Sequence, residues 1–246
     1  MDLGLNDRRA LVTAASRGIG RACASSLATE GARVYIASRD ASAIEAAGRE
    51  VGAVGWYAAD VSKAGEPEAL VNAAVDVLGG LDILVVNSGG PPASTFQTTP
   101  LEGWDNAVHL LLMSAVRLIK TALPHLKASD QGRIVIITSI AVRQPIPNLV
   151  LSNSLRAAVT GLAKTLSSEL APDRITVNCI APDAIRTDAL MRLGGDLGEM
   201  EVAAPMKRLG EPEEVGALCA FLCSRRAGYI TGQTLGIDGG SLLGVH

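Results

Sequence analysis

Ser152 and Arg156 are the first residues to consider for chemistry, because they stand four positions apart in a stretch expected to be helical. That spacing places both side chains on one face of a helix. A serine hydroxyl alone is a poor proton donor or acceptor near neutral pH, and an arginine stays charged. The pair can therefore hold a ligand, but it offers no titrating group that moves a proton.

A second segment has the residue types that hold a phosphate-rich ligand. The run Thr13-Ala14-Ala15-Ser16-Arg17-Gly18-Ile19-Gly20 follows the first expected strand and opens the first expected helix. Its two glycines allow a pyrophosphate to approach the backbone, and the helix N-terminus adds free N–H groups and the positive end of a dipole. A glycine cluster alone is weak evidence, but this position between strand and helix indicates a dinucleotide site.

The residues after the second expected strand, Ser38-Arg39-Asp40, bear on which dinucleotide is bound. An acidic residue there accepts hydrogen bonds from a ribose 2′-hydroxyl, whereas an arginine pairs with a 2′-phosphate. Arg39, assisted by Arg17, favours NADP(H) over NAD(H), although Asp40 argues in the other direction. In the alternative interpretation both arginines are solvated surface side chains.

Short β-branched runs alternate with helical stretches along the whole chain, without a linker or repeat. This alternation predicts one α/β domain over residues 1–246, a Rossmann-type doubly wound sheet of seven parallel strands with helices on both faces. Ligands of such sheets bind beyond the carboxyl ends of the strands. The expected strands are 10–13, 33–38, 55–58, 81–87, 133–138, 175–181 and 234–238, and the expected helices are 18–29, 41–51, 66–78, 101–127, 148–171 and 211–224.

Composition argues against several classes of function. The 246 residues are 48% hydrophobic and 19% charged, which favours a compact soluble domain. A net charge of −3 argues against a nucleic-acid or anionic-membrane surface. No apolar run is expected to be long enough to cross a membrane, and the most apolar helix, Ala107 to Ile119, is interrupted by His109 and Arg117. No signal peptide is visible, so a cytoplasmic location is expected. The four cysteines are expected to be buried structural thiols, without a metal site.

Several further motifs lie along the chain. They are Asp60-Val61, Asn87-Ser88-Gly89-Gly90, Arg133 to Ser139, Ile175 to Asn178, Pro182 to Thr187, Arg208 to Val215, and Tyr229 to Gly232 with Asp238 to Gly240. Together with the glycine turn, they resemble the short-chain dehydrogenase/reductase family, closest to its 3-oxoacyl-acyl-carrier-protein reductase branch, over nearly the whole chain. The resemblance implies that a nicotinamide dinucleotide is bound by Ala14, Ser16, Arg17, Gly18, Ile19, Gly20, Arg39, Asp60, Val61, Asn87, Gly89, Arg156, Pro182, Ile185 and Thr187.

The resemblance also implies a catalytic tetrad of Asn, Ser, Tyr and Lys, in which tyrosine donates a proton and lysine lowers the tyrosine pKa. Ser139 keeps the serine position, whereas Leu111, Ser152 and Arg156 stand at the asparagine, tyrosine and lysine positions. The candidate catalytic residues are thus Ser139, Ser152 and Arg156. Ser139 would bind the substrate oxygen, and Arg156 would hold the nicotinamide ribose.

Two other positions depart from the family pattern. Ala14 replaces the first glycine of the turn and adds a Cβ, and Asp183 replaces a glycine beside the expected nicotinamide loop. Asp183 and Arg143 are further candidates for the active site. His109 lies two positions before Leu111 and is expected to point away from it.

Two segments resemble a divergent branch of the family whose glycine and tetrad patterns are incomplete: Ser88 to Pro92 and Gln144 to Pro147. The losses are therefore interpreted as a feature of a lineage. The segment 188–206, with Gly194-Gly195 and Gly198, is expected to form a mobile, weakly helical lid over the substrate cleft.

Two functions remain open on the sequence. The first is an oxidoreductase-type protein that binds NADP(H) and reduces a carbonyl, of a small molecule or an acyl thioester, by a non-standard route. The second is a non-catalytic protein, either a dinucleotide sensor or a structural partner in an oligomer. In both cases the resemblance implies a homotetramer or homodimer, packed through the helices 101–127 and 148–171.

Overall fold

Seven parallel strands form one sheet in the order β3-β2-β1-β4-β5-β6-β7, which confirms the expected architecture. The computed structural model describes residues 2–192 and 196–244. The chain order reverses between β1 and β4, so these two strands mark the switch point at which ligands of such sheets bind. The strands are β1 Arg9–Val12, β2 Arg33–Ser38, β3 Gly55–Ala58, β4 Ile83–Val86, β5 Arg133–Ile137, β6 Thr176–Pro182 and β7 Thr234–Ile237.

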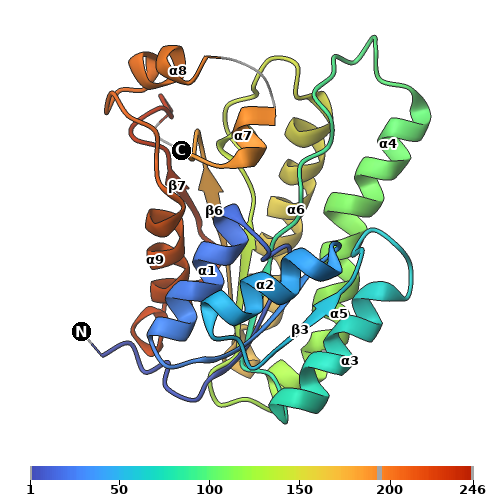
Figure 1. Ribbon diagram of the computed structural model, residues 1–246, viewed down its shortest axis with the longest axis vertical. Helices are drawn as coiled ribbons and strands as arrows, with labels where there is room; N and C mark the ends of the chain where they lie inside the picture. The colour runs from blue at the N-terminus through green and yellow to red at the C-terminus, as the bar shows by residue number, and fades with distance from the viewer. Residues whose placement is uncertain (1, 193–195, 245–246) are drawn as a thin grey trace.

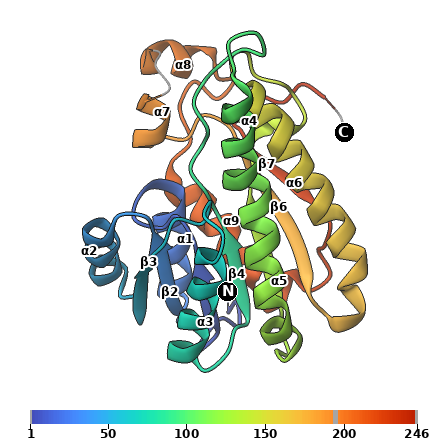
Figure 2. The ribbon, with the colours of Figure 1, turned by 90° about the vertical axis from the view of Figure 1, so that its right-hand side faces the viewer.

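Helices cover both faces of the sheet, and each face has its own apolar core (Figures 1 and 2). Helices α1 Gly18–Thr29, α2 Ala41–Val51 and α9 Pro212–Cys223 pack on one face. Helices α3 Glu66–Leu78, α5 Ser114–Lys127 and α6 Val150–Glu169 pack on the other. The central strands β4 and β5 are buried along their whole length, as an apolar run between two helical layers requires.

The amino-terminal edge of the sheet is held by Asp82, whose side chain is 4% exposed. Its carboxylate accepts hydrogen bonds from Arg9 Nε at 2.8 Å, from Arg9 Nη2 at 2.7 Å and from Ser129 Oγ at 2.6 Å. Burial raises the pKa of Asp82, but these hydrogen bonds outweigh it and leave the pKa below its usual value. The network joins β1, the start of β4 and the turn before β5.

The long helix expected over 101–127 is not one regular helix. It begins as α4 Leu101–Ala107, passes through a π-helix at Val108–Met113, and continues as α5. By length and composition this run could cross a membrane, with a mean hydropathy of 1.4, so the expectation that no run is long enough was wrong. Leu118 and Leu126 of α5 lie instead in the core beneath the sheet, which is the position of a core helix.

The segment expected to form a lid is more ordered in secondary structure than its glycines suggest. It forms α7 Asp188–Arg192 and α8 Leu197–Ala203, above the carboxyl ends of the strands (Figure 1). Asp196 caps α8 by accepting hydrogen bonds from the backbone of Gly198 and Glu199. Gly194 and Gly195 lie outside the described residues.

Candidate functional site

The turn between β1 and α1 has the shape that a bound pyrophosphate requires. Gly18 has φ +55° and Ala14 has φ +48°, so both lie in the left-handed region. A Cβ on Gly20 would collide with the backbone of Ala14 and stand 2.8 Å from Asn87 Nδ2. The glycines therefore leave the backbone of this turn without side chains that would block a ligand. The N-terminus of α1 follows the turn directly, which fits the phosphates of a dinucleotide.

Thr13 and Asn87 lock this turn to the switch point. Thr13 Oγ1 donates to the carbonyl of Asn87 at 2.7 Å and accepts from its backbone N–H at 2.9 Å. The Asn87 amide also donates to the carbonyl of Ala14 at 3.3 Å. Asn87 thus supports the turn from below, and Thr13 is a supporting residue that the sequence analysis did not single out. Its position directly after the first strand was the available signal.

The end of β2 separates the roles of Arg39 and Asp40. Asp40 is the N-cap of α2, and its carboxylate accepts hydrogen bonds from Ala43 N at 2.9 Å and Ser42 Oγ at 2.8 Å. These bonds lower the pKa of Asp40, with a smaller contribution from Arg17. The carboxylate is therefore engaged by the helix terminus. Arg39 is exposed, and its guanidinium remains available to a ligand at this edge.

Asp60 follows β3 and faces the same side of the site as Arg39. Its Oδ1 accepts from Ser62 Oγ at 2.7 Å and from Ser62 N at 3.1 Å. Burial raises the pKa of Asp60, but the bonds from Ser62 and the charge of Arg39 outweigh it and lower the pKa overall. The carboxylate is thus ionised and fixed in direction, next to the buried Val61.

The segment after β6 closes against the glycine turn. A Cβ on Gly18 would stand 3.2 Å from Thr187 Cγ2, which shows how closely the two segments approach. Ile185 is buried and pairs with Gly210 in an isolated bridge. Arg17 and Asp188 are 3.7 Å apart, an ion pair that crosses from one segment to the other. The glycine turn and the segment 182–187 therefore lie against each other.

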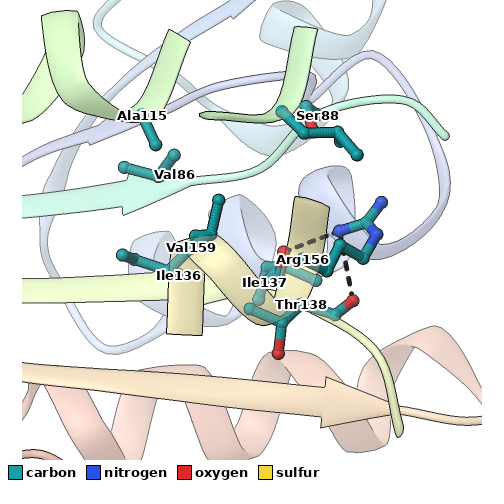
Figure 3. A pocket seen from close by; sticks show the side chains of 9 residues that line it. Val86, Ser88, Ala115, Ile136, Ile137, Thr138, Arg156 and Val159 are labelled. Carbon is teal, nitrogen blue, oxygen red and sulfur yellow. Dashed lines mark hydrogen bonds between the residues drawn. The ribbon is translucent and has the colours of Figure 1, made fainter. Parts of the chain in front are cut away.

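Ser152 and Arg156 meet on the inner face of α6. Arg156 Nε donates to Ser152 Oγ at 3.2 Å. Figure 3 shows the bonds that Arg156 Nη1 donates to the carbonyls of Ile137 at 3.0 Å and Thr138 at 3.2 Å. Thr138 directly precedes Ser139, so the guanidinium lies beside the end of β5. The structure thus brings Ser152 and Arg156 together beside the end of β5, where Ser139 follows in the chain.

Ser139 caps the short helix that follows it. Its Oγ accepts a hydrogen bond from Ala141 N at 3.2 Å. A hydroxyl that accepts from the backbone keeps its own hydrogen for another acceptor. Ser139 can therefore donate to the oxygen of a bound ligand.

A small cavity lies beside Arg156 (Figure 3). Ser88 and Thr138 contribute polar atoms to it, and Ser88 was not among the residues that the sequence analysis selected. The remaining walls are mostly apolar: Val86, Leu111, Ala115, Ile136, Ile137 and Val159. Burial lowers the pKa of Arg156 to about 10, so the guanidinium is still charged at neutral pH.

Leu111 is 4% exposed and lies in the π-helix with its side chain in the cluster of Ala107, Leu151 and Leu155. An apolar side chain cannot hold the water that an asparagine would bind there. His109 is exposed whereas Leu111 is buried, so the two side chains point in different directions, as expected, although the helix here is wider than the regular one assumed. The asparagine position of the tetrad is therefore occupied by a packed apolar side chain.

The other candidates do not join this centre by hydrogen bonds. Arg143 is exposed, and its Nη2 donates to the carbonyl of Thr234 on β7 at 2.7 Å. The backbone N–H of Asp183 donates to the carbonyl of Ile237, while its side chain is half-buried. Tyr35 is buried and donates to the carbonyl of Trp56, and Tyr229 is fully exposed.

The four cysteines are buried with free thiols, as expected. Among the described residues no group of three or more His, Cys, Asp or Glu side chains could hold a metal ion.

Comparison with known proteins agrees with this geometry. A family model described as enoyl-(acyl carrier protein) reductase matches residues 13–241. The dehydrogenase/reductase SDR family member 4 of Bos taurus is 38% identical over 247 residues, which cover 97% of this chain and 88% of the relative. The 3-oxoacyl-[acyl-carrier-protein] reductase FabG of Staphylococcus epidermidis is 36% identical over 95% of this chain and 98% of that protein.

Solved structures are similar over their full length. L-Sorbose reductase from Gluconobacter frateurii, complexed with NADPH and L-sorbose, superposes with a TM-score of 0.93 at 34% identity and covers 100% of both chains. The 3-ketoacyl-(acyl-carrier-protein) reductase from Brucella melitensis, complexed with NADH, gives a TM-score of 0.91 at 32% identity over 96% of this chain and 99% of that one.

Proposed function

The chain belongs to the short-chain dehydrogenase/reductase family of oxidoreductases, and from that premise we propose that it binds NADP(H) and reduces a carbonyl by a route that lacks the tyrosine and lysine of its relatives. The observation that carries the proposal is the glycine turn at the switch point of the sheet. Asn87 stabilises this turn by a hydrogen bond to the carbonyl of Ala14, and Thr187 lies close to Gly18. Solved relatives hold NADPH or NADH, which supports a nicotinamide dinucleotide.

The residues present fit such a dinucleotide. The turn 14–20 would take its pyrophosphate, Asp60 and Val61 its adenine, and Pro182, Ile185 and Thr187 its nicotinamide end, with Gly89 beside Asn87. When bound, the nicotinamide supplies the hydride. Arg156 would donate to a ribose hydroxyl through Nη2, since Nε and Nη1 already have acceptors.

The side chains of this chain then orient the substrate. Ser139 donates its hydroxyl hydrogen to the substrate oxygen and holds the carbonyl carbon near the nicotinamide. Ser152 ends well short of where a phenol would reach, so water supplies the proton that completes the alcohol. This route lacks a positioned general acid, which typically contributes a factor of about 10² to 10⁴. We therefore expect slow turnover.

The direct test is the loss of NADPH absorbance with purified protein and a panel of ketones that includes 3-oxoacyl thioesters. Slow oxidation that depends on the ketone is expected, and Ser139→Ala should abolish it. No oxidation with any ketone, while NADPH still binds, would refute the catalytic proposal.

Arg39 is proposed to select the phosphorylated dinucleotide, because Asp40 is committed to the N-terminus of α2. We predict that Arg39→Ala weakens NADPH binding by about tenfold to a hundredfold, the worth of a charge-assisted hydrogen bond. NADH binding should change less than threefold. Isothermal titration calorimetry with both dinucleotides measures the difference, and equal losses for both would contradict the assignment.

The changed tetrad supports a second candidate, a non-catalytic protein that senses a dinucleotide or acts as a structural partner. Its motivating observation is Leu111, whose side chain is packed into an apolar cluster where the family has a polar one. Calorimetry separates the two forms of this candidate. Binding without turnover supports a sensor, and no binding supports a structural role.

We also propose a homotetramer or homodimer packed through α4, α5 and α6. The observation that supports it is the apolar run 101–127, of which only 39% of the most apolar window is buried within one chain. Small exposed residues on α6, among them Ala157, Ala158 and Gly161, allow a second helix to approach closely.

A further inference from the structure

Arg156 is a partly buried cation without an anion. The ion pairs of the described residues use other arginines and lysines, and burial alone acts on the pKa of Arg156, with no carboxylate to raise it. A buried charge that has only neutral partners is costly, because backbone carbonyls and a hydroxyl do not neutralise it. A negative ligand would remove that cost.

The polar atoms around Arg156 offer hydrogens and no negatively charged acceptor. Nη2 has no hydrogen-bond acceptor among the described residues, whereas Nε and Nη1 have theirs. Ser152 Oγ accepts from Arg156, so this hydroxyl keeps its own hydrogen to donate. A cluster of donors around one positive charge is complementary to a carboxylate, which only accepts.

The surroundings favour an anion further. Most walls of the cavity beside Arg156 are aliphatic, and no aspartate or glutamate lines it. Electrostatic attraction is stronger where water is excluded.

We propose that Arg156, with Ser152, binds the carboxylate of the substrate, so that this chain prefers short oxo acids to neutral ketones, while Ser139 holds the reducible carbonyl. The inference rests on the proposed function because it treats the bound acid as the molecule that is reduced. Binding at the site can nevertheless be tested without turnover. Because Arg156 Nη1 contacts the carbonyl next to Ser139, the carboxylate and the reducible carbonyl must be only a few bonds apart. Nη2 carries two hydrogens, one for the carboxylate and one for a ribose hydroxyl.

The test compares propanoate with propanamide, which have nearly the same shape and differ in charge. Binding is measured by calorimetry on the full chain saturated with NADP⁺, so that no reduction can occur. We expect propanoate to bind about tenfold to a hundredfold more tightly than propanamide, the range for hydrogen bonds to a charged group. Equal binding of the two, or no binding of propanoate, would refute the inference and leave the proposed function untouched.

Variants assign the preference to Arg156. Arg156→Met should abolish the preference for propanoate, and Arg156→Lys should retain part of it because the charge remains. The matched control is Lys164→Met, which removes one positive charge from the same helix at an exposed side chain that donates only to the carbonyl of Gly232. The control should keep the full preference. If Arg156→Met instead weakens NADP⁺ binding and leaves the propanoate preference intact, Arg156 belongs to the dinucleotide and the inference is wrong.

A competition arm identifies the anion. Inorganic phosphate is titrated against bound propanoate, and we expect it to compete at least tenfold more weakly. If phosphate displaces propanoate because it binds the site more tightly than propanoate does, the site recognises a phosphoryl group and the carboxylate assignment is refuted. The variants Arg156→Met, Arg156→Lys and Lys164→Met should show the same circular dichroism spectrum as the parent protein. If Arg156→Met does not fold, Arg156→Lys still tests the inference.

Discussion

At three positions the chain differs from the family's catalytic tetrad, namely Leu111, Ser152 and Arg156. Substitution can separate the effect of each difference on activity. Leu111 and Ser152 are both nearly buried, so the pocket that a phenol and an amide would occupy is partly filled by packing. We predict that Leu111→Asn, Ser152→Tyr and Arg156→Lys together raise the rate of NADPH-dependent ketone reduction by about a hundredfold or more, the typical worth of a positioned general acid.

The control for this rescue is the double variant Ser152→Tyr with Arg156→Lys, which leaves Leu111 in place. It should regain less activity, because the water-binding amide is still missing. If the triple variant binds NADPH and stays inactive, the pocket has diverged elsewhere, and Asp183 becomes the first residue to replace.

Ala14 is strained at the turn that binds the dinucleotide. Its φ of +48° costs an L-residue about 1–2 kcal/mol relative to glycine, whereas the glycine gains about 0.5–1 kcal/mol of conformational freedom when unfolded. We predict that Ala14→Gly raises the free energy of unfolding by about 0.5–1 kcal/mol, measured by urea denaturation. Lys207→Gly, at φ +56° outside the turn, is the control for the backbone effect.

Dinucleotide binding separates the two glycine variants. Ala14→Gly should also strengthen NADPH binding slightly because a Cβ is removed from the turn, while Lys207→Gly should not. A loss of stability in Ala14→Gly would show that the left-handed backbone is not the source of strain.

At the scale of elements, the network of Asp82 joins β1, β4 and the turn before β5. The carboxylate is buried, and hydrogen bonds to charged groups are worth about 1.5–3 kcal/mol. We predict that Asp82→Asn lowers the free energy of unfolding by about 2 kcal/mol. Asp130→Asn, which removes an exposed carboxylate that pairs with Arg8, should cost less than about 1 kcal/mol.

The same network gives a pH dependence. The pKa of Asp82 is lower in the folded chain than in the unfolded chain, so ionised Asp82 stabilises the fold above the usual carboxyl pKa near 3.8. That stability is lost as the pH falls below this value toward the folded pKa. The difference in unfolding free energy between the parent and Asp82→Asn should therefore shrink between pH 5 and pH 2, as followed by urea denaturation. A difference that is independent of pH would contradict the assignment.

Much of the element order could be predicted from the sequence, because local signals mark the ends. The helix 41–51 matches its expected range, with Asp40 at its N-cap and Gly52 in the left-handed conformation at its C-cap. The π-helix could not be predicted, because buried residues four apart fit a regular and a wide turn equally well. The sequence analysis expected weak helix within 188–206 but gave no bounds for α7 and α8, because neither helix has a buried face.

The candidate site was predictable only in part. The motifs locate Ser139, Ser152 and Arg156, and the strand order explains why they meet at one edge. The bonds from Arg156 to the carbonyls of Ile137 and Thr138 depend on how α6 packs beside β5, which no local pattern specifies. The commitment of Asp40 to α2 likewise required the geometry of the cap.

At the scale of the whole molecule, the exposed face of α6 is expected to pack against another copy of the chain. A Cβ on Gly161 meets no atom within 4 Å, and a side chain there replaces a poor helix former, so Gly161→Glu should not harm the fold of one chain. We predict that it shifts the sedimentation coefficient from a dimer or tetramer to a monomer. Ala46→Glu, which adds the same charge on α2, should leave the oligomer intact.

A parent protein that sediments as a monomer would contradict the proposed assembly. An oligomer that survives Gly161→Glu would place the contact on another face of the molecule.

The wide turn at Val108–Met113 gives the long helix one residue more than a regular turn would hold. Such a turn spaces its hydrogen bonds five residues apart, one more than a regular turn. A regular turn covers nearly the same rotation with one residue fewer, so a deletion within the wide turn would leave α5 in its present orientation relative to α4. Ala107 would still pack toward α6 and Leu118 under the sheet. A deletion in α4 or α5 would instead rotate the residues beyond it by about 100°. Changes in chain length should therefore be tolerated in the wide turn and absent from the regular helix on either side.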